Sequence, residues 1–290
     1  MLNQKIKKQI LTAQKNEITE YFVYNKLADS IKDKHNQEIL REIASDEKRH
    51  YDFWKTQTNQ EIKPSAFNLW KYFLSAKIFG ITFSLRLMEQ GEERAQINYN
   101  EIAKTIPEAL AIAQDENDHE QELIELLDEE KLKYIGSVVL GLNDALVELT
   151  GALAGFTLAL QNTRLIAITG LITGIAASLS MAASEYLATK SEQEGGKNPA
   201  KAALYTGLAY IIVVSLLILP FLVLGNLLLA LGITLTNAVL IILFFTFYIS
   251  VAQNRNFKKR FLEMAGISLG VAILTFGIGW LIRIFFGIEV

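Results

Sequence analysis

Five long apolar runs occupy the second half of this chain, and they restrict its fold more than any other feature. The runs span about 136–160, 164–188, 202–224, 226–252 and 262–286. Each run is long enough for an α-helix to cross the hydrocarbon core of a bilayer, which takes about 20 residues. The core of a soluble protein does not require five consecutive runs of this length. The sequence therefore predicts five transmembrane helices.

The composition changes abruptly near residues 134–136, and this step divides the 290-residue chain into two parts. Residues 1–135 contain most of the charged side chains and all three histidines, whereas apolar residues and glycine dominate the rest. A chain of this length accommodates about two domains. We therefore expect an all-α protein, with a soluble domain over 1–134 and a membrane domain over 135–290.

Net charge and cysteine content exclude several classes of function. The formal net charge is −3 and there is no block of basic residues, so we expect no nucleic-acid partner. The chain has no cysteine, which excludes disulfides, iron–sulfur clusters and thiolate zinc sites. Any bound metal must then use oxygen and imidazole ligands. The N-terminal stretch is too polar for a signal peptide, so we expect the first domain to stay in the cytoplasm.

Basic residues in the short loops predict the orientation of the five spans. The side of the membrane that faces the first domain carries Lys131, Lys133, Lys190, Lys197, Lys201, Arg255, Lys258, Lys259 and Arg260. The opposite side has only Arg164 and Arg283. Because basic loops stay in the cytoplasm, the first domain is expected there. We expect an integral protein of the cell membrane.

The first two spans contain acidic residues that a membrane normally excludes. Asp144 and Glu148 share one face of the first span with Gly151 and Gly155. Carboxylates inside a span are costly and normally face a cavity or a partner, so both are candidates for a transport path. Glu148 also has an alternative interpretation, in which it extends toward the membrane interface. The two glycines are expected to form a packing groove.

The second span repeats this pattern. Gly174, Ser178, Met181 and Glu185 lie on one face of it, and the small residues allow a neighbouring helix to approach closely. Met181 and Glu185 are one turn apart, and both can face the same path as Asp144. Two alternatives remain open: Met181 is simply packed or lipid-facing, and Glu185 extends toward the interface.

The soluble part is predicted to contain four long helices, at about 3–32, 36–59, 76–105 and 107–132. A shorter amphipathic piece, SAFNLWKYFLSAKIFG at 65–80, precedes the third helix. Its aromatic residues suit a bundle wall, a dimer contact or the membrane surface, and the sequence does not choose between them.

Two Glu-x-x-His pairs lie in the stretches EIASDEKRHYDFW (42–54) and AIAQDENDHEQEL (111–123). A further glutamate lies 27 residues before the glutamate of each pair (47 − 20 and 116 − 89). One offset of 69 residues relates the two triplets, which predicts two copies of a helical hairpin. The first triplet is Glu20, Glu47 and His50, and the second is Glu89, Glu116 and His119.

Two such hairpins bring four carboxylates and two imidazoles into one interior, which is the ligand set of a di-iron carboxylate bundle. We therefore expect iron as the cofactor, with manganese as an alternative. Glu92, one turn after Glu89, is a candidate for an additional, movable ligand, and the alternative is a solvated or supporting acid. Glu17 is interpreted as a solvated or supporting acid, and His35 as an exposed residue in a turn. The alternative is that both pairs are solvated surface groups.

These motifs carry a resemblance to known families. Residues of about 10–130 resemble erythrin, a ferritin-like domain of rubrerythrin type, at the six residues of the two triplets. Residues of about 131–290 resemble the vacuolar iron transporter family, at GLNDALVELTGALAGF in the first span and SLSMAASEY in the second. The whole chain resembles a membrane-bound ferritin type, in which a di-iron bundle precedes a five-span transporter.

The resemblance implies a homodimer that moves Fe²⁺, and sometimes Mn²⁺, out of the cytosol in exchange for protons. It matches the family's pore aspartate to Asp144, and its second-span methionine and glutamate to Met181 and Glu185. Plant and fungal-type members carry a long acidic metal-binding segment between the second and third spans. Here the link is only TKSEQEGGKNPAK, with Glu192 and Glu194. We expect the N-terminal bundle to collect iron in place of that segment.

Three functions remain open at this point. The first is a metal exporter whose cytosolic domain collects iron. The second is a membrane-tethered di-iron oxidase or peroxidase, although no rubredoxin-like cysteines supply electrons and a mere anchor needs no intramembrane acids. The third makes the N-terminal domain a sensor that gates the pore when iron is abundant.

Overall fold

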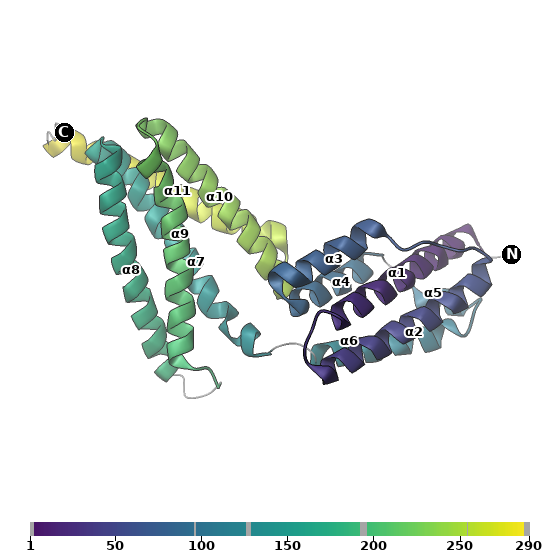
Figure 1. Cartoon of the computed structure of the whole chain (residues 1–290). Coiled ribbons are helices and arrows are strands. Elements are labelled where there is room, and N and C mark those ends of the chain that lie inside the picture. Colours follow the sequence, from purple (N-terminus) through teal and green to yellow (C-terminus); the bar gives the residue numbers. More distant parts are fainter. Residues whose placement is uncertain (1–2, 96, 126–128, 192–195, 254, 287–290) are drawn as a thin grey trace. The chain divides into compact units, whose positions relative to one another are not determined.

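The computed structural model describes residues 3–95, 97–125, 129–191, 196–253 and 255–286, and every regular element in these ranges is an α-helix (Figure 1). The expectation of an all-α protein is confirmed for this part of the chain. The chain forms two compact units: Met1–Asp128 with Val251–Asn254, and Glu129–Ser250 with Arg255–Val290.

Helices α1 (Gln4–Ala28) and α2 (Lys34–Thr58) form a hairpin in the first unit (Figure 1). Each begins at a side chain that satisfies a free backbone N–H group. Asn3 accepts a hydrogen bond from the N–H of Lys5, and Asp33 accepts one from the N–H of Asn36. The facing sides are apolar, and their core includes Val23, Leu27, Leu40 and Ile43. This core fixes how far α1 is shifted along α2. It thereby determines which polar residues of the two helices lie opposite each other.

Within the residues that the structure describes, the first unit also has four shorter helices: α3 (Ala66–Phe79), α4 (Ile81–Ala95), α5 (Tyr99–Ala103) and α6 (Ala109–Glu125). The sequence predicted one helix over 76–105, but the structure divides this range. Gly80 has a φ of 94°, a conformation that favours glycine, and α3 ends there. Asn98 starts α5 by accepting a hydrogen bond from the N–H of Glu101. The short amphipathic piece predicted at 65–80 corresponds to α3.

The described residues of the second unit form five long helices: α7 (Glu129–Leu160), α8 (Thr163–Ser191), α9 (Pro199–Val223), α10 (Leu227–Ala252) and α11 (Phe257–Phe286). All five are long and apolar enough to cross a membrane, which confirms the prediction of five spans. Helix α7 begins before the composition step at 134–136 and passes through it without a break. The acids Glu192 and Glu194 lie outside the described residues.

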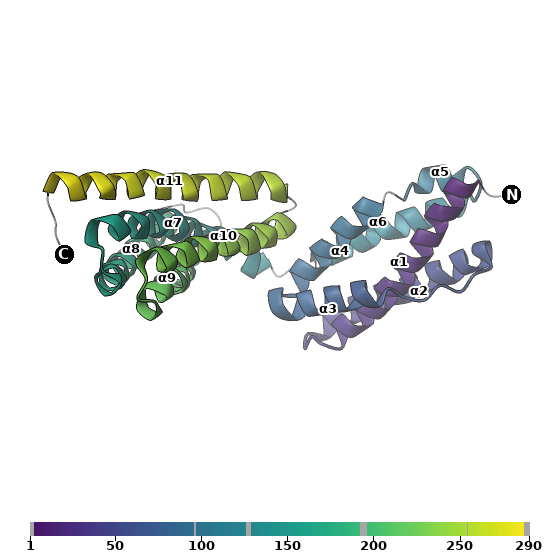
Figure 2. The same ribbon diagram turned by 90° about the horizontal axis from the view of Figure 1, so that it is seen from above.

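Helix α7 packs against α8, α9 and α11 in this unit (Figure 2). The contact with α11 is close because both helices present glycine. A Cβ atom on Gly279 would lie 2.2 Å from the carbonyl oxygen of Gly155. One turn away, the Thr275 hydroxyl donates a hydrogen bond of 2.6 Å to the carbonyl of Gly151. The two α7 glycines thus form the packing surface that the sequence predicted.

Candidate functional site

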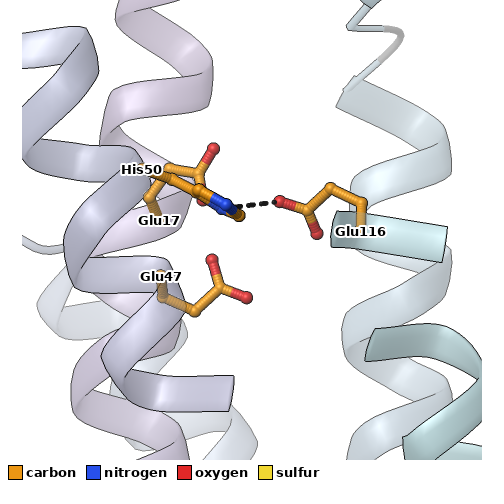
Figure 3. A group of neighbouring side chains, drawn as sticks. All are labelled: Glu17, Glu47, His50 and Glu116. Atoms are coloured by element: carbon orange, nitrogen blue, oxygen red, sulfur yellow. Dashed lines mark ion pairs between the residues drawn. The ribbon is translucent and has the colours of Figure 1, made fainter. Parts of the chain in front are cut away.

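Four side chains from three helices of the first unit come together in a group that can hold a metal ion (Figure 3). They are Glu17 from α1, Glu47 and His50 from α2, and Glu116 from α6. One nitrogen or oxygen atom of each lies within 4.8 Å of those of the other three. Glu47 and His50 project together because three residues make almost one helical turn. Glu47, His50 and Glu116 belong to the ligand set that the sequence predicted, whereas Glu17 does not.

Glu17 is the unexpected member of this group. The sequence interpretation made it a solvated or supporting acid, but its side chain is only 2% exposed. The indole Nε1 of Trp54, a fully buried residue, donates a hydrogen bond of 3.2 Å to Oε1 of Glu17. This bond uses one carboxylate oxygen and leaves the other directed at the group.

The two histidines occupy equivalent positions with their rings 5.9 Å apart (centroid to centroid). Nδ1 of His50 lies 3.4 Å from carboxylate oxygens of both Glu17 and Glu116. Nδ1 of His119 lies 3.4 Å from Oε1 of Glu47. The ring atom that faces the carboxylates is therefore Nδ1 in both histidines, and each histidine faces the glutamate of the other Glu-x-x-His pair.

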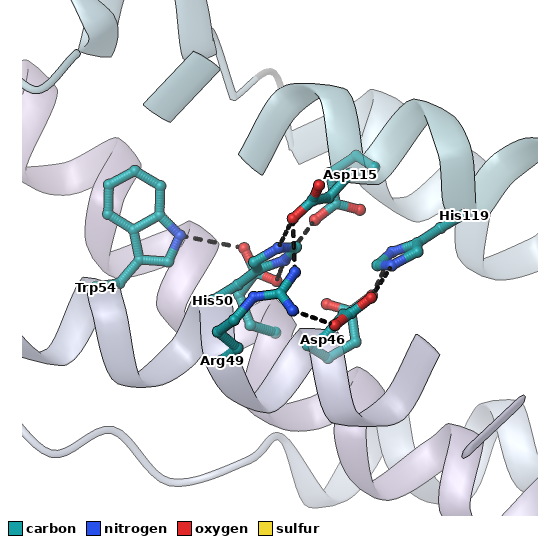
Figure 4. A network of polar contacts seen from close by, with 9 residues as sticks. Asp46, Arg49, His50, Trp54, Asp115 and His119 are labelled. Atoms are coloured by element: carbon teal, nitrogen blue, oxygen red, sulfur yellow. Dashed lines mark hydrogen bonds and ion pairs between the residues drawn. The ribbon is translucent and has the colours of Figure 1, made fainter. Parts of the chain in front are cut away.

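The opposite ring nitrogen of each histidine contacts an aspartate of the other motif (Figure 4). Nε2 of His50 is 3.0 Å from Oδ2 of Asp115, and Nε2 of His119 is 3.3 Å from Oδ2 of Asp46. Arg49 connects the two aspartates by donating hydrogen bonds of 2.5 Å to Asp46 and 2.8 Å to Asp115. Partners of this kind fix the ring orientation and the tautomer of metal-binding histidines.

The sequence interpretation missed both aspartates, although a signal for them exists. Each stands immediately before the glutamate of its pair, so the repeated motif is Asp-Glu-x-x-His rather than Glu-x-x-His. The same offset of 69 residues relates them (115 − 46). Residues at i and i+4 lie on one side of a helix, so the aspartate and histidine of each motif are neighbours.

The environment of the group strongly perturbs its ionisation. Burial raises the pKa of the Glu47 carboxyl, and the nearby Glu116 and Glu17 raise it further. Burial also raises the pKa of Glu116, and the charge of Glu17 adds to this effect. Burial alone lowers the pKa of His50, but its polar contacts with Glu116, Glu17 and Asp115 outweigh burial and raise that pKa to about 10. The repulsion among these acids is relieved when a cation binds.

Three atoms of the group are buried without a hydrogen-bond partner, namely Oε2 of Glu17, Oε2 of Glu47 and Nδ1 of His50, and Nδ1 of the neighbouring His119 is a fourth such atom. The contacts of 3.4 Å between these ring nitrogens and the carboxylates are ion-pair contacts and do not have hydrogen-bond geometry. A buried polar atom without a partner costs about 1–3 kcal/mol. Atoms of this kind, converging on one point, fit a bound metal cation. Oxygen and imidazole donors suit Fe²⁺, Mn²⁺ or Zn²⁺.

The other predicted ligands of the first unit lie in different surroundings. Glu20 is buried and lines a cavity of about 190 Å³ beside Glu17 and Glu116. Glu89 forms an ion pair of 2.8 Å with Arg86, one turn earlier on α4. The side chain of Glu92 lies outside the described residues. His35 is exposed as expected, but it lies in the first turn of α2 rather than in the predicted turn.

The cavity next to Glu20 gives access to the metal-binding group. Its lining is Asn16, Glu17, Glu20, Ile97, Tyr99 and Glu116. A more open hollow of about 610 Å³ shares Ile97, Tyr99 and Glu116 with it and is also lined by Asn98, Asn100 and Asn117. Small ions and molecules can therefore reach the buried carboxylates beside Tyr99.

In the second unit, two of the predicted path residues, Glu148 and Glu185, have polar partners on neighbouring helices. The Tyr210 hydroxyl on α9 donates a hydrogen bond of 2.9 Å to Oε2 of Glu148. Asp144 is half-buried one turn before Glu148. The Ser137 hydroxyl on α7 donates a hydrogen bond of 2.5 Å to Oε1 of Glu185 on α8. Ser137 lies two turns before Asp144 and three turns before Glu148. The hydrogen bond from Ser137 to Glu185 and the one from Tyr210 to Glu148 are therefore made on the same side of α7.

Met181 is partly buried and packs against the apolar core of the second unit. Its position fits packing as well as it fits a path, and it lies one turn from Glu185 on α8. Glu185 is half-buried and bonds to Ser137 rather than to Asp144. The structure thus gives Glu148 and Glu185 different hydrogen-bond partners, Tyr210 and Ser137.

Comparison with known proteins identifies the helices that hold these acids. A model of the VIT family matches residues 135–196, about a fifth of the chain. Residues 135–196 are a VIT family domain. The domain covers most of α7 and all of α8, and it contains Asp144, Glu148, Met181 and Glu185. Comparisons with curated proteins and with solved structures found no match.

The VIT domain and the five apolar helices together indicate an integral membrane protein. The VIT family also indicates a transporter with metal ions as substrates. The predicted partners of the chain, a lipid bilayer and metal ions, agree with both observations.

Proposed function

We propose that this protein exports a divalent transition metal, Fe²⁺ or alternatively Mn²⁺, from the cytosol in exchange for protons. The single observation that carries the proposal is the VIT match over the two helices that contain Asp144, Glu148 and Glu185. Intramembrane carboxylates are costly and typically mark an ion path. The thioether of Met181 is a soft ligand that favours Fe²⁺ over Mg²⁺ or Ca²⁺.

Hydroxyl donors beside two of these acids support the exchange of protons for metal. Tyr210 donates to Glu148, and Ser137 donates to Glu185. A carboxyl group that holds a proton in the absence of metal must release it when a cation binds. Alternate binding of metal and protons at these groups would couple the two opposite flows.

Glu148 also supports a homodimer in the cell membrane. Its side chain is exposed at the surface of the single chain, where lipid would otherwise surround it. A charge facing lipid is strongly unfavourable, whereas a charge facing a partner subunit or a water-filled path is not. The proposed dimer therefore places the α7 acids at the subunit interface, with the first unit in the cytoplasm.

The first unit is proposed to be a ferritin-like di-iron domain that collects, oxidises or senses the metal. The repeated Asp-Glu-x-x-His motif and the unpartnered Nδ1 atoms support this role. The proposed ligands are Glu17, Glu20, Glu47, His50, Glu89, Glu92, Glu116 and His119. Glu89 would have to leave Arg86 to join them. When bound, two iron ions would supply reversible electron transfer, while the chain holds them and excludes bulk water.

The test of transport uses the full chain in proteoliposomes that contain a metal-sensitive dye. Asp144→Ala is expected to abolish metal movement driven by a pH gradient, and Asp144→Asn to do the same with less change in volume. Thr236→Ala, at an exposed position on α10, is the matched control and should transport normally. Unchanged transport in both Asp144 variants would contradict the proposed path.

A second function, oxidation of iron by peroxide, is favoured by the cavity that leads to the buried group. Reduction of one hydrogen peroxide to two water molecules takes two protons and two electrons, one from each of two Fe²⁺ ions. The full chain loaded with Fe²⁺ should then consume peroxide, and Glu47→Gln should abolish this while Asp144→Ala does not. Consumption at the same rate in Glu47→Gln would exclude the first unit as its source.

A further inference from the structure

An apolar face of α3 is exposed to solvent in the first unit. Phe67, Trp70, Leu74 and Ile78 are 77%, 52%, 47% and 69% exposed, respectively. Their spacing of three, four and four residues places them on one side of the helix. The opposite side, with Tyr72 and Ala76, is buried in the unit. Soluble proteins rarely expose a continuous apolar stripe of this kind without a partner.

Basic residues surround this stripe. Lys26 on α1 lies over the rings of Trp70 and Phe73, 5.1 Å and 4.8 Å from their centroids. Lys77 lies 5.4 Å from the centroid of Phe73, and Lys71 lies beside Tyr72. The long stems of these lysines add to the apolar surface, and their charges lie at its edge.

Acidic residues are absent from the same part of the sequence. Between Glu61 and Glu89 there is no aspartate or glutamate, whereas Lys63, Lys71, Lys77 and Arg86 are present. The rest of the first unit is rich in acids, so this segment has an unusual charge. A basic helix with one apolar, Trp-containing face is typical of binding at a lipid surface.

We propose that the exposed face of α3 binds the surface of the membrane that the same chain spans, with a preference for anionic phospholipid. The described part of the second unit has five helices that can cross a bilayer, so the first unit is covalently tethered to such a surface. This tethering gives lipid a high effective concentration at α3, which no soluble partner matches. The cations complement the lipid phosphates, while Trp70 and Leu74 enter the boundary between headgroups and acyl chains. The proposal does not depend on metal transport.

The absence of cysteine from the chain allows a direct test. Leu74→Cys, labelled with a nitroxide, is reconstituted as the full chain in nanodiscs of phosphatidylcholine with or without phosphatidylglycerol. Power saturation then compares the access of oxygen, which concentrates in lipid, with that of a polar nickel chelate. In anionic nanodiscs we expect the ratio of oxygen to nickel access at residue 74 to rise severalfold above that of Glu42→Cys, an exposed control position on α2.

Ile78→Cys provides a second, independent position if Leu74→Cys does not fold. The double variant Lys71→Gln/Lys77→Gln should lose most of the dependence on anionic lipid, while Lys7→Gln/Lys34→Gln, on exposed parts of α1 and α2, should retain it. High access of both reagents would mean a solvent-exposed face and would overturn the proposal. Low access of both, with dipolar broadening between labels, would mean contact with a second copy and would also overturn it.

Discussion

His50 and Asp115 connect the two repeated motifs of the first unit, with Nε2 of His50 3.0 Å from Oδ2 of Asp115. Burial opposes ionisation of Asp115, but its contacts with His50 and Arg49 outweigh burial and lower its pKa. The aspartate is therefore an ionised acceptor for the Nε2–H group. In the neutral form of the ring, which is the form that binds a metal, the lone pair then lies on Nδ1, the ring atom that faces Glu17 and Glu116.

Asp115→Asn is predicted to weaken metal binding by about 10–100-fold, which is typical when the supporting partner of a metal-binding histidine is lost. The amide can present an N–H group to Nε2 and thereby favour the wrong tautomer. Asp46→Asn should act in the same way through His119. Titration of the purified full chain with Fe²⁺ under anaerobic conditions measures the effect.

Asp52→Asn is the matched control for these variants. Asp52 is exposed on α2 and forms a salt bridge with Lys48, away from both histidines. Its replacement should leave the affinity for metal unchanged. If Asp115→Asn bound metal as tightly as Asp52→Asn, the aspartate would have no positioning role.

Glu17 and Glu89 provide a comparison between two acids that sequence and structure rank differently. Glu17 belongs to the buried group, whereas Glu89 is paired with Arg86. Glu17→Gln is therefore predicted to reduce the number of metal ions bound per chain or their affinity more than Glu89→Gln does. Metal analysis after equilibrium dialysis decides between them, and a larger loss in Glu89→Gln would restore the ligand set expected from the repeat.

The difference between these two acids shows how far sequence alone can reach. Hydropathy predicted the five spans because each membrane helix needs a long apolar run, and helical spacing predicted the two Glu-x-x-His pairs. Glu17 and Glu20 lie three residues apart on the same face of α1, so periodicity cannot choose between them. The choice depends on how far α1 is shifted along α2, which the packing of their apolar side chains sets.

The repeat also predicted that the two hairpins would contribute equivalent ligands, and the structure differs from this prediction. The offset of 69 residues places Arg86 at the position equivalent to Glu17 (86 − 17). A cation at that position attracts Glu89, and the second hairpin then differs from the first. Gly80 interrupts the third predicted helix, which a periodic apolar pattern alone does not reveal. Single residues that differ between the two copies of the repeat, such as Arg86 and Gly80, thus decide which of the predicted ligands come together at the metal-binding group.

Metal binding to the first unit is predicted to release protons and to tighten as the pH rises. The pKa of His50 is raised to about 10, so this ring holds a proton near neutral pH before metal binds, and the pKa values of Glu47 and Glu116 are also raised. A metal competes with protons at these groups, and a higher pH makes their release easier. Calorimetry in buffers of different ionisation enthalpy measures the released protons. Affinity that falls between pH 6 and pH 8 would contradict the assignment of these residues as ligands.

Tyr210→Phe is predicted to slow metal transport without preventing folding. The variant keeps the ring but removes the hydroxyl that donates 2.9 Å to Glu148. Glu148 then loses the hydrogen bond that holds its carboxylate against α9, so the proposed ion-path residue is less well positioned. Transport in proteoliposomes is compared with that of Tyr186→Phe, an exposed tyrosine on α8. Equal rates in the two variants would show that the Tyr210 hydroxyl has no part in transport.

Gly279→Ala is predicted to destabilise the second unit because α7 and α11 have no room for a methyl group at their contact. The new Cβ atom would lie 2.2 Å from the carbonyl oxygen of Gly155, so the backbones must separate. Overpacking of this kind typically costs about 1–3 kcal/mol.

Gly270→Ala, on the same helix but with no atom within 4 Å of its Cβ position, is the matched control. Because alanine favours a helix by about 1 kcal/mol over glycine, the control should be neutral or stabilising. Thermal unfolding of the purified protein in detergent measures both variants, and a lower midpoint for Gly270→Ala than for Gly279→Ala would mean that α11 does not pack on α7 through Gly279.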